Sequence, residues 1–424
     1  MATGSITPYD FYLVSEKDNF IDTSSFPLKA WHRAVTLDTI FRFYSYLEIN
    51  INDEMGTIIG KVVNGEGQIV ESYLGVTADE LNNWLVGRWV WDSNQVIDCK
   101  PAKHIRGNSI ISFFSHYYMY DAVKTRVWND TISNIVATIL KDDYKIPVSD
   151  IVVGGNYDKK NALAFVTPTT GKNVYYQINE SNSEFIKRLA TRAYSEKYEY
   201  SPFVTFTNSK KEIYFCALEE LYNKGEVISK EIYKLTDDQD TSTNPFSIRK
   251  IEFLQTGLVA NKPTYKKKIY NQKSTGVVGS EVTQLKDHSV SREKGKILIH
   301  KDNLEYQKIA FSYEDFGLYN EATETSLLKG YRNSFYVDSM LYLRLNIDII
   351  FNSKAVTGKT IDIEIGSNID ERNNKTSEFC GKWLIIKSQH YWDSRGLPIH
   401  HLELAKNRAV PDSTVNVFKN NFIS

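Results

Sequence analysis

The chain has few cysteines, and none of them is placed for a cross-link or a metal site. Cys99, Cys216 and Cys380 are the only three in 424 residues, they lie far apart, and no CxxC pair occurs. This spacing argues against a disulfide framework and against a zinc knuckle. We expect each cysteine to be a small buried apolar residue, as in a protein that folds in a reducing cytoplasm.

Excess charge and long apolar runs are also lacking. The 51 basic and 52 acidic residues leave a net charge of −1, which gives no reason to expect bulk binding to nucleic acid or to an anionic membrane. The best apolar run, Ile347–Phe351, is far shorter than the roughly 18 residues that a membrane helix needs. The first 20 residues have neither the basic nor the apolar region of a signal peptide. We expect a soluble protein without membrane anchor.

The common sequence motifs of enzymes and metal sites are absent. There is no GxSxG, no GxxxxGK[ST] and no HExxH. The histidines His390, His400 and His401 are close in sequence, but adjacent residues of a strand point to opposite faces. His400 and His401 therefore cannot both bind one ion. We predict no metal-binding and no cofactor-binding residues.

The carboxylates have equally plain interpretations. Glu219 and Glu220 are expected at the start of a short surface helix, and Asp362 and Glu364 on the solvated face of a strand. A hydrolase would need a nucleophile with an activating base or two well-placed carboxylates, and neither is evident. We predict no catalytic residues and no enzymatic activity.

The first third of the chain has a β pattern. Aromatic residues make up 13% of the sequence, and they favour strands and large packed interfaces. After an N-terminal arm at 1–30, alternating runs predict a barrel or sandwich over 31–127, with a short helix at Asp79–Leu85. The expected strands are Ile40–Asn52, Thr57–Val63, Ile69–Leu74, Trp89–Val96 and Ile110–Tyr120.

The spacing of apolar residues then changes from the two-residue period of a strand to the 3.6-residue period of a helix. This change indicates an α+β unit at 128–235. A helix is predicted at Trp128–Lys141, capped by Asn129 or Asp130. The segment Tyr175–Phe215 predicts a strand, then a helix with a capping box between Ser181 and Glu184, then a hairpin. The hairpin strands are expected at Phe203–Thr207 and Ile213–Ala217.

The last third returns to β structure. Residues 236–333 are an extended loop and strand region that completes the middle of the chain, where Lys266–Lys268 and Lys286–Lys301 are either solvated strand edges or a basic patch for DNA. Leu341–Phe351 alternates over eleven positions and predicts the clearest strand of a second barrel at 334–410, before a C-terminal tail at 411–424. Further strands are expected at Thr360–Ile365, Lys382–Lys387 and His400–Leu404.

Two phrases in a fixed order carry a resemblance to a known family. The first phrase consists of Tyr176, Gln177, Asn179, Glu180 and Ser181, followed by Phe185, Leu189 and Ala190. The second phrase is the strand Gly381–His390. Over about residues 30–410 the chain resembles the baseplate hub proteins of contractile-tailed phages, the hub part of type VI secretion spike proteins and the late-control tail proteins.

The resemblance implies a mainly β fold with two tail-tube-like antiparallel β-barrels separated by an α+β domain. It implies a homotrimer whose six barrels form a pseudo-hexameric ring, because a doubled domain converts three-fold into approximate six-fold symmetry. The implied partners are the central spike protein, the tail tube protein, other baseplate proteins and the tape measure protein, with genomic DNA only in transit. The implied location is the tail baseplate of a virion assembled in the bacterial cytoplasm.

The chain departs from the type VI relatives in one respect. It ends at Ser424 without a repetitive spike sequence, so the resemblance places the spike and any peptidoglycan-cutting activity in another protein. Three alternatives to a phage hub stay open: a tail-associated peptidoglycan hydrolase, the hub of a related contractile injection system, and a DNA-binding protein that uses the two lysine-rich stretches.

Overall fold

The computed structural model describes most of the middle of the chain and parts of both ends. The described residues are 10–15, 31–52, 69–75, 85–90, 108–155, 162–198, 201–225, 233–235, 247–254, 279–286, 289–294, 299–300, 311–312, 341, 343–350, 352, 354–364, 381–393, 399–406 and 422–423. Over these residues the protein is mainly β with few helices, as the sequence predicts. No helix within these ranges is long and apolar enough to cross a membrane.

Strands from both ends of the chain belong to one twelve-stranded sheet. Its order is β1-β4-β5-β6-β3-β2-β21-β20-β13-β14-β19-β22. The N-terminal half comprises β1 (Asp10–Ser15), β2 (Trp31–Thr39), β3 (Tyr46–Asn52), β4 (Ile69–Gly75), β5 (Leu85–Val90) and β6 (Asn108–Ser115). The C-terminal half comprises β13 (Tyr233–Leu235), β14 (Ser247–Leu254), β19 (Leu343–Ile350), β20 (Thr360–Glu364), β21 (Gly381–Asp393) and β22 (Ile399–Lys406).

The long strand β21 joins the two halves. Along one edge it pairs with β22, and along the other it pairs first with β20 and then with β2. The C-terminal strands are therefore connected in a circuit of pairings that leaves β21 through β20 and returns through β22. Side chains inside this circuit form one core, which includes Leu345, Ile347, Ile349, Trp383 and Leu402.

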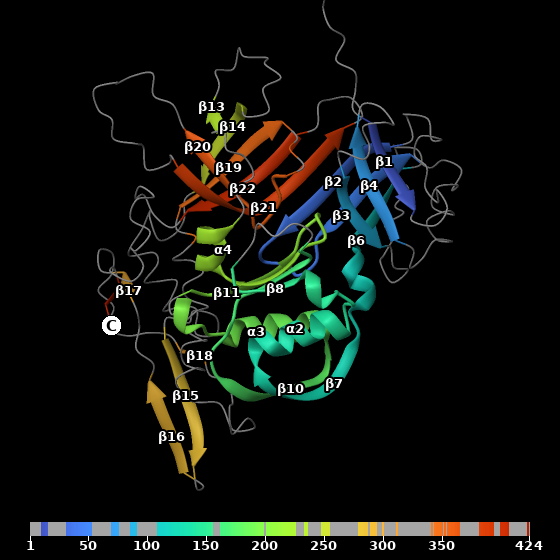
Figure 1. Cartoon of the computed structure of the whole chain (residues 1–424). Coiled ribbons are helices and arrows are strands. Elements are labelled where there is room, and N and C mark those ends of the chain that lie inside the picture. The colour runs from blue at the N-terminus through green and yellow to red at the C-terminus, as the bar shows by residue number, and fades with distance from the viewer. Residues whose placement is uncertain are drawn as a thin grey trace, which may run out of the picture.

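The chain between the halves folds as a layered α+β unit. Its elements are η3 (His116–Tyr120), β7 (Val123–Thr131), α2 (Ile132–Asp142), η4 (Val148–Asp150), β8 (Ile151–Val153), β9 (Ala164–Val166), β10 (Lys172–Ser181), α3 (Asn182–Arg192), η5 (Glu196–Tyr198), β11 (Phe203–Thr207), β12 (Ile213–Ala217) and α4 (Leu218–Lys224). Strands β11-β12-β9-β8 form a four-stranded sheet, and β7 and β10 form a separate ribbon. The α2 and α3 helices lie between the two (Figure 1).

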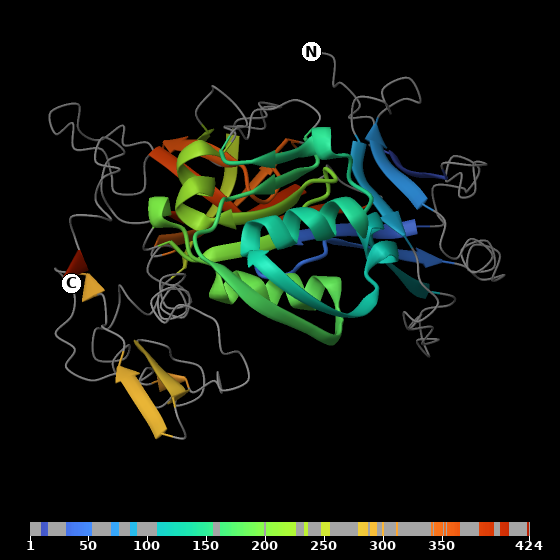
Figure 2. The same cartoon turned by 60° about the horizontal axis from the view of Figure 1, so that its bottom comes forward.

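Both figures show the four-stranded sheet on the side of the α+β unit that meets the large sheet, and the β7–β10 ribbon on the far side (Figures 1 and 2). One core fills the space around α2 and α3, with Ile135, Ile139, Phe185, Leu189 and Phe215 at its centre. A second core joins the other face of the four-stranded sheet to the large sheet, through Phe206, Tyr214, Leu384 and Ile386.

A small group of strands lies apart from this body (Figure 1). β15 (Gly279–Lys286) and β16 (Ser289–Lys294) form a hairpin, and β18 (Phe311–Ser312) pairs with β15. β17 (Ile299–His300) pairs with β23 (Phe422–Ile423) near the C-terminus. Part of the expected basic stretch Lys286–Lys301 is therefore strand, whereas Lys266–Lys268 lies outside the described residues.

The predicted strand–helix–hairpin segment is confirmed in detail. Ser181 caps α3, its side chain accepts from the Glu184 backbone, and the Glu184 carboxylate accepts from the Ser181 backbone, which is a complete capping box. Strands β11 and β12 have the predicted bounds and pair antiparallel. Strands β4, β19, β20 and β22 also lie where alternation predicts them.

Several predicted elements are wrong in part. Leu85, predicted as the end of the short helix Asp79–Leu85, is the first residue of β5, so the strand predicted from Trp89 begins four residues earlier. Ile40–Asn52 is not one strand: β2 ends at Thr39, and the chain turns before β3 because Ile40 and Phe43 enter two different cores. Strand β6 ends at Ser115, and His116–Tyr120 is a 3₁₀ helix. Helix α2 starts at Ile132 and not at Trp128, with Thr131 as its cap, since β10 pairs with Trp128–Thr131.

Other predictions concern residues whose structure is not described. These are the strand Thr57–Val63, positions 79–84 of the short helix, positions 91–96, the basic residues at 266–268, and the environments of Cys99 and Cys380. Cys216 is buried among apolar side chains, as predicted.

Candidate functional site: a polar sheet face and the junction behind it

One face of the C-terminal half of the large sheet is mainly polar, and its rows of side chains continue onto β2 and β3 of the N-terminal half. In an antiparallel pair, directly opposed residues point to the same side, so the register defines rows of side chains across the strands. One row is Tyr46, Leu37, Gln389, His401, Asp348 and Lys250, and the next is Thr39, Lys387, Glu403, Asn346 and Glu252. Each row crosses from the N-terminal half into the C-terminal half. We call this surface the polar face.

Several side chains of the polar face contact one another across the strands. The His401 Nδ1 atom lies 2.6 Å from Asp348 Oδ1, and Arg344 lies 3.7 Å from the Glu403 carboxylate. The Asn346 amide donates to Glu252 at 3.4 Å. These contacts join the three adjacent strands β14, β19 and β22.

The opposite face of the same strands is buried and holds two neutral histidines. His390 and His400 lie directly opposite each other in the register, with ring centroids 3.8 Å apart. His390 Nδ1 is 2.9 Å from the Thr36 hydroxyl, and His400 Nε2 is 2.8 Å from the Ser388 hydroxyl. Burial lowers the pKa of His390 to about 3 and the pKa of His400 well below its usual value. The sequence correctly predicted His400 and His401 on opposite faces.

The turn between β11 and β12 enters this junction and contacts both halves. Thr207 donates its backbone N–H to Phe43 O at 2.6 Å and accepts from the Ser45 N–H at 3.0 Å. Ser209 donates to Asp38 Oδ2 from its N–H at 3.1 Å and from its hydroxyl at 2.8 Å. The Asn208 amide donates to Thr357 O at 3.3 Å. We call residues 207–212 the hairpin tip.

A buried ion pair completes the contact with the C-terminal half. Lys359 is 3% exposed, and its Nζ lies 3.0 Å from Glu212 Oε1. Glu212 Oε2 accepts from the Asn208 amide at 2.7 Å and from the Tyr214 hydroxyl at 2.8 Å. Gly358 precedes the lysine with a φ of +91°, and a Cβ atom there would lie 2.9 Å from the Phe206 ring. The turn therefore requires glycine for both its conformation and its space.

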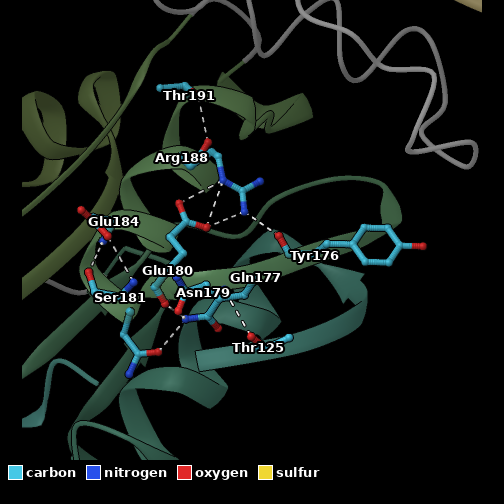
Figure 3. A network of polar contacts seen from close by, with 10 residues as sticks. Thr125, Tyr176, Gln177, Asn179, Glu180, Ser181, Glu184, Arg188 and Thr191 are labelled. Carbon is cyan, nitrogen blue, oxygen red and sulfur yellow. Dashed lines mark hydrogen bonds and ion pairs between the residues drawn. The ribbon is translucent and has the colours of Figure 1, made fainter. Parts of the chain in front are cut away.

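A second polar network fixes the turn between β10 and α3 (Figure 3). The Gln177 amide donates to Glu180 O at 3.0 Å and to Asn182 Oδ1 at 3.1 Å. Asn179 has a φ of +49° and donates its N–H to the Thr125 hydroxyl. Asparagine tolerates this left-handed conformation better than most residues, and it allows the bulge between Gln177 and Glu180.

Arg188 ties the helix back to the strand (Figure 3). Its guanidinium donates to both Glu180 carboxylate oxygens, the shortest contact being 2.7 Å, and to Tyr176 O at 2.6 Å. Gln177, Asn179, Glu180 and Ser181 of the first phrase thus hold the β10–α3 turn together with the Tyr176 carbonyl. Phe185, Leu189 and Ala190 lie in the core behind it. None of these contacts supplies a reacting group.

Known structures show what this arrangement of layers is similar to. The structure of the 43 kDa tail protein of prophage MuSo2 from Shewanella oneidensis matches with a TM-score of 0.50 at 10% identity, covering 95% of this chain and 100% of that one. The chain has the fold of a phage tail protein.

Two further tail and secretion proteins are similar at lower scores. A tail protein from Neisseria meningitidis MC58 matches at a TM-score of 0.49 and 10% identity, over 94% of this chain and 97% of that one. An E. coli component of the type VI secretion system, described as similar to phage T4 tail proteins, matches at 0.41 and 9%, over 89% and 73%. No protein-family model matches the sequence, and no curated protein matches it.

The sequence predicts surface positions for two pairs of carboxylates, Glu219 with Glu220 and Asp362 with Glu364. Glu219 and Glu220 do begin helix α4, but Glu220 is buried, where it accepts from the Thr167 and Tyr198 hydroxyls. A surface position for Glu220 is therefore wrong. Asp362 is half-buried on β20. Among the residues that the structure describes, no group of three or more His, Cys, Asp or Glu side chains could hold a metal ion.

The sequence did not indicate the junction of the tail-protein fold. More than a hundred residues separate each of its charged side chains from the next, namely Asp38, Glu212 and Lys359. No local sequence motif therefore indicates that they meet. The only available signals were a charge in the alternating run of β2 and the polar turn that starts at Asn208.

Asp38 gives the junction a specific pH dependence. Burial raises the pKa of its carboxyl from 3.8 to about 7, against the lowering effect of the two Ser209 hydrogen bonds. A raised folded pKa contributes stability below 3.8 that is lost as the pH rises towards 7. We expect Asp38→Asn to match the wild type near pH 4 and to exceed it at pH 8 by on the order of 4 kcal/mol.

Urea unfolding of both proteins at the two pH values measures this difference. The two neutral histidines act in the opposite direction, since their stabilisation is lost as the pH falls from 6.5. Both proteins carry them, so the comparison cancels their effect. An equal difference at both pH values would show that Asp38 does not titrate in this range.

Proposed function

We propose that this protein is a structural hub of a phage tail baseplate. Three copies would form a pseudo-hexameric ring that joins the tail tube to the central spike and allows DNA to pass. The polar face, which continues from the C-terminal half onto β2 and β3 of the N-terminal half, carries this proposal, because a ring built from two similar halves per subunit needs a wall that continues between them. The tail-protein fold supports a role in the tail.

In this proposal the polar face lines the lumen. Two of its carboxylates, Asp348 and Glu403, lie beside His401 and Arg344, and a third, Glu252, accepts from the Asn346 amide. A wall that carries both basic and acidic side chains neither retains a polyanion strongly nor repels it, which suits a channel that DNA only crosses. The buried face of the same strands carries the core and the hairpin tip, so only the polar face is suited to water.

The six-stranded halves take the role of tube-like barrels in the proposal, and the α+β unit braces them from outside. The pairing circuit of the C-terminal half supports the first point, and the hairpin tip, which contacts both halves, supports the second. The proposed partners are the spike protein, the tail tube protein, other baseplate proteins and the tape measure protein. The proposed location is the virion tail, after assembly in the host cytoplasm.

Mass photometry and electron microscopy of the purified protein test the ring. We expect particles of three subunits with a central hole at micromolar concentration. Binding to duplex DNA should be weak and without the steep salt dependence of a phosphate-binding protein. A stable monomer at micromolar concentration would overturn the proposal, and so would muropeptide release that one carboxylate substitution abolishes.

A further inference from the structure

Asp38 meets the hairpin tip through a single residue. Its carboxyl is fully buried on β2, and both donors to Oδ2 belong to Ser209, the N–H at 3.1 Å and the hydroxyl at 2.8 Å. The Oδ1 atom is also buried and has no hydrogen-bond partner among the described residues. Every hydrogen bond that the structure gives this carboxyl therefore comes from the tip.

The hydroxyls beside Asp38 on the buried face already have partners. Ser388 lies opposite Asp38 in the register, and its hydroxyl donates to Ala355 O at 3.0 Å. A hydroxyl has one proton to donate, so this group has none left for Asp38. Thr36, two residues along β2, has its hydroxyl 2.9 Å from His390 Nδ1. An ionised Asp38 would thus depend on the tip alone for its donors.

The charged groups around the junction do not offset the burial of Asp38. The titratable residues on the surrounding elements are Lys210, Lys211 and Glu212 of the tip, Tyr117 of η3, His390 of β21, His400 of β22 and Lys359 before β20. The buried lysine of this set pairs with the tip carboxylate at 3.0 Å, and the two histidines are neutral. Burial remains the largest effect on the Asp38 carboxyl and raises its pKa to about 7, whereas the two Ser209 hydrogen bonds lower it.

We propose that the hairpin tip is a latch between the α+β unit and the N-terminal half, and that ionisation of Asp38 favours its opening. While the tip is docked, the carboxylate is buried with Ser209 as its only donor, and once the tip leaves, water solvates the charge. The docked state thus prefers the protonated acid. By linkage, loss of that proton must favour the open state. The latch operates within one chain and does not depend on the proposed ring.

Amide hydrogen exchange of the full-length protein at pH 5, 7 and 8 measures the opening. The Thr207 N–H donates to Phe43 O and the Ser209 N–H donates to Asp38, so both amides become exposed when the tip leaves the N-terminal half. After correction for intrinsic exchange rates, we expect their opening equilibrium constant to rise about 50-fold from pH 5 to pH 7. It should rise only about two-fold more to pH 8, because the docked carboxyl with a pKa of about 7 has then lost its proton.

Two variants make this result specific to Asp38. Asp38→Asn keeps an oxygen that can accept from both Ser209 donors but cannot ionise, so its opening constant should change by less than about two-fold over the same range. Both proteins carry His390 and His400, so the ratio of wild type to variant isolates the carboxyl. Ser209→Ala removes one donor to the ionised form, and the pH at which the rise levels off should move upward.

A control amide separates opening of the latch from unfolding of the protein. The Ile213 N–H donates to Leu163 O within the α+β unit and should keep its protection at all three pH values. The same pH trend in wild type and in Asp38→Asn would overturn the latch. So would exchange of the Thr207 and Ser209 amides that follows Ile213 at every urea concentration, because the tip would then open only with the whole protein.

Discussion

Replacing Leu189 with Asp is expected to lower the free energy of unfolding by about 5 kcal/mol or more. Leu189 is fully buried in the core around α2 and α3. Removing a buried leucine costs about 2–5 kcal/mol through lost burial and the remaining cavity, and an unpaired carboxylate in the same place adds to that cost. Chemical denaturation followed by tryptophan fluorescence measures the change.

Two control variants make the Leu189 result specific. Leu189→Met keeps the volume and should cost less than about 1.5 kcal/mol. Lys187→Asp introduces the same charge two residues away, at an exposed position of the same helix, and should cost less than about 1 kcal/mol. A loss below about 1 kcal/mol for Leu189→Asp would mean that this side of α3 is not part of a packed core.

Replacing Lys359 with Met is expected to cost about 3–5 kcal/mol, because it leaves the Glu212 carboxylate in the junction without its cation. Asn208 and Tyr214 would still donate to that carboxylate, but neither carries a charge. Urea unfolding should show one cooperative transition at a lower midpoint.

The matched experiment for the ion pair is a double-mutant cycle. Glu212→Gln removes the charge and keeps a group that can accept from Asn208. We expect the double variant Lys359→Met with Glu212→Gln to recover most of the stability that the single lysine substitution loses. Equal and additive losses in both single variants and the double variant would show that the two side chains do not interact.

Local patterns were sufficient to predict the elements that depend on neighbouring residues. The capping box of Ser181 and Glu184, the β11–β12 hairpin and the alternation of β19 are all decided within a dozen residues. The predicted start of α2 was wrong because Trp128–Thr131 pairs as a strand with β10, more than 40 residues further along the chain. Tertiary pairing overrode a plausible helical pattern there.

The arrangement of the sheet and the junction could not be predicted from one sequence. The pairing of β2 with β21 joins residues about 350 positions apart, and no local property of either strand specifies it. The same is true of Asp38, whose partner Ser209 lies in another layer. Alternation was visible on β19 alone, and the continuation of the polar face through β21 and β2 depends on this long-range register.

The shared strand β21 also has a mechanical consequence. Both halves of the large sheet hydrogen-bond to the same 13-residue strand, so they are not connected by a flexible linker alone. A load applied to one half would reach the other through a continuous covalent backbone. Inserting a single residue near the middle of β21 would reverse every side chain beyond it and exchange polar and apolar faces in one half only. The number of residues in β21 therefore determines whether the polar faces of the two halves lie on the same side of the sheet.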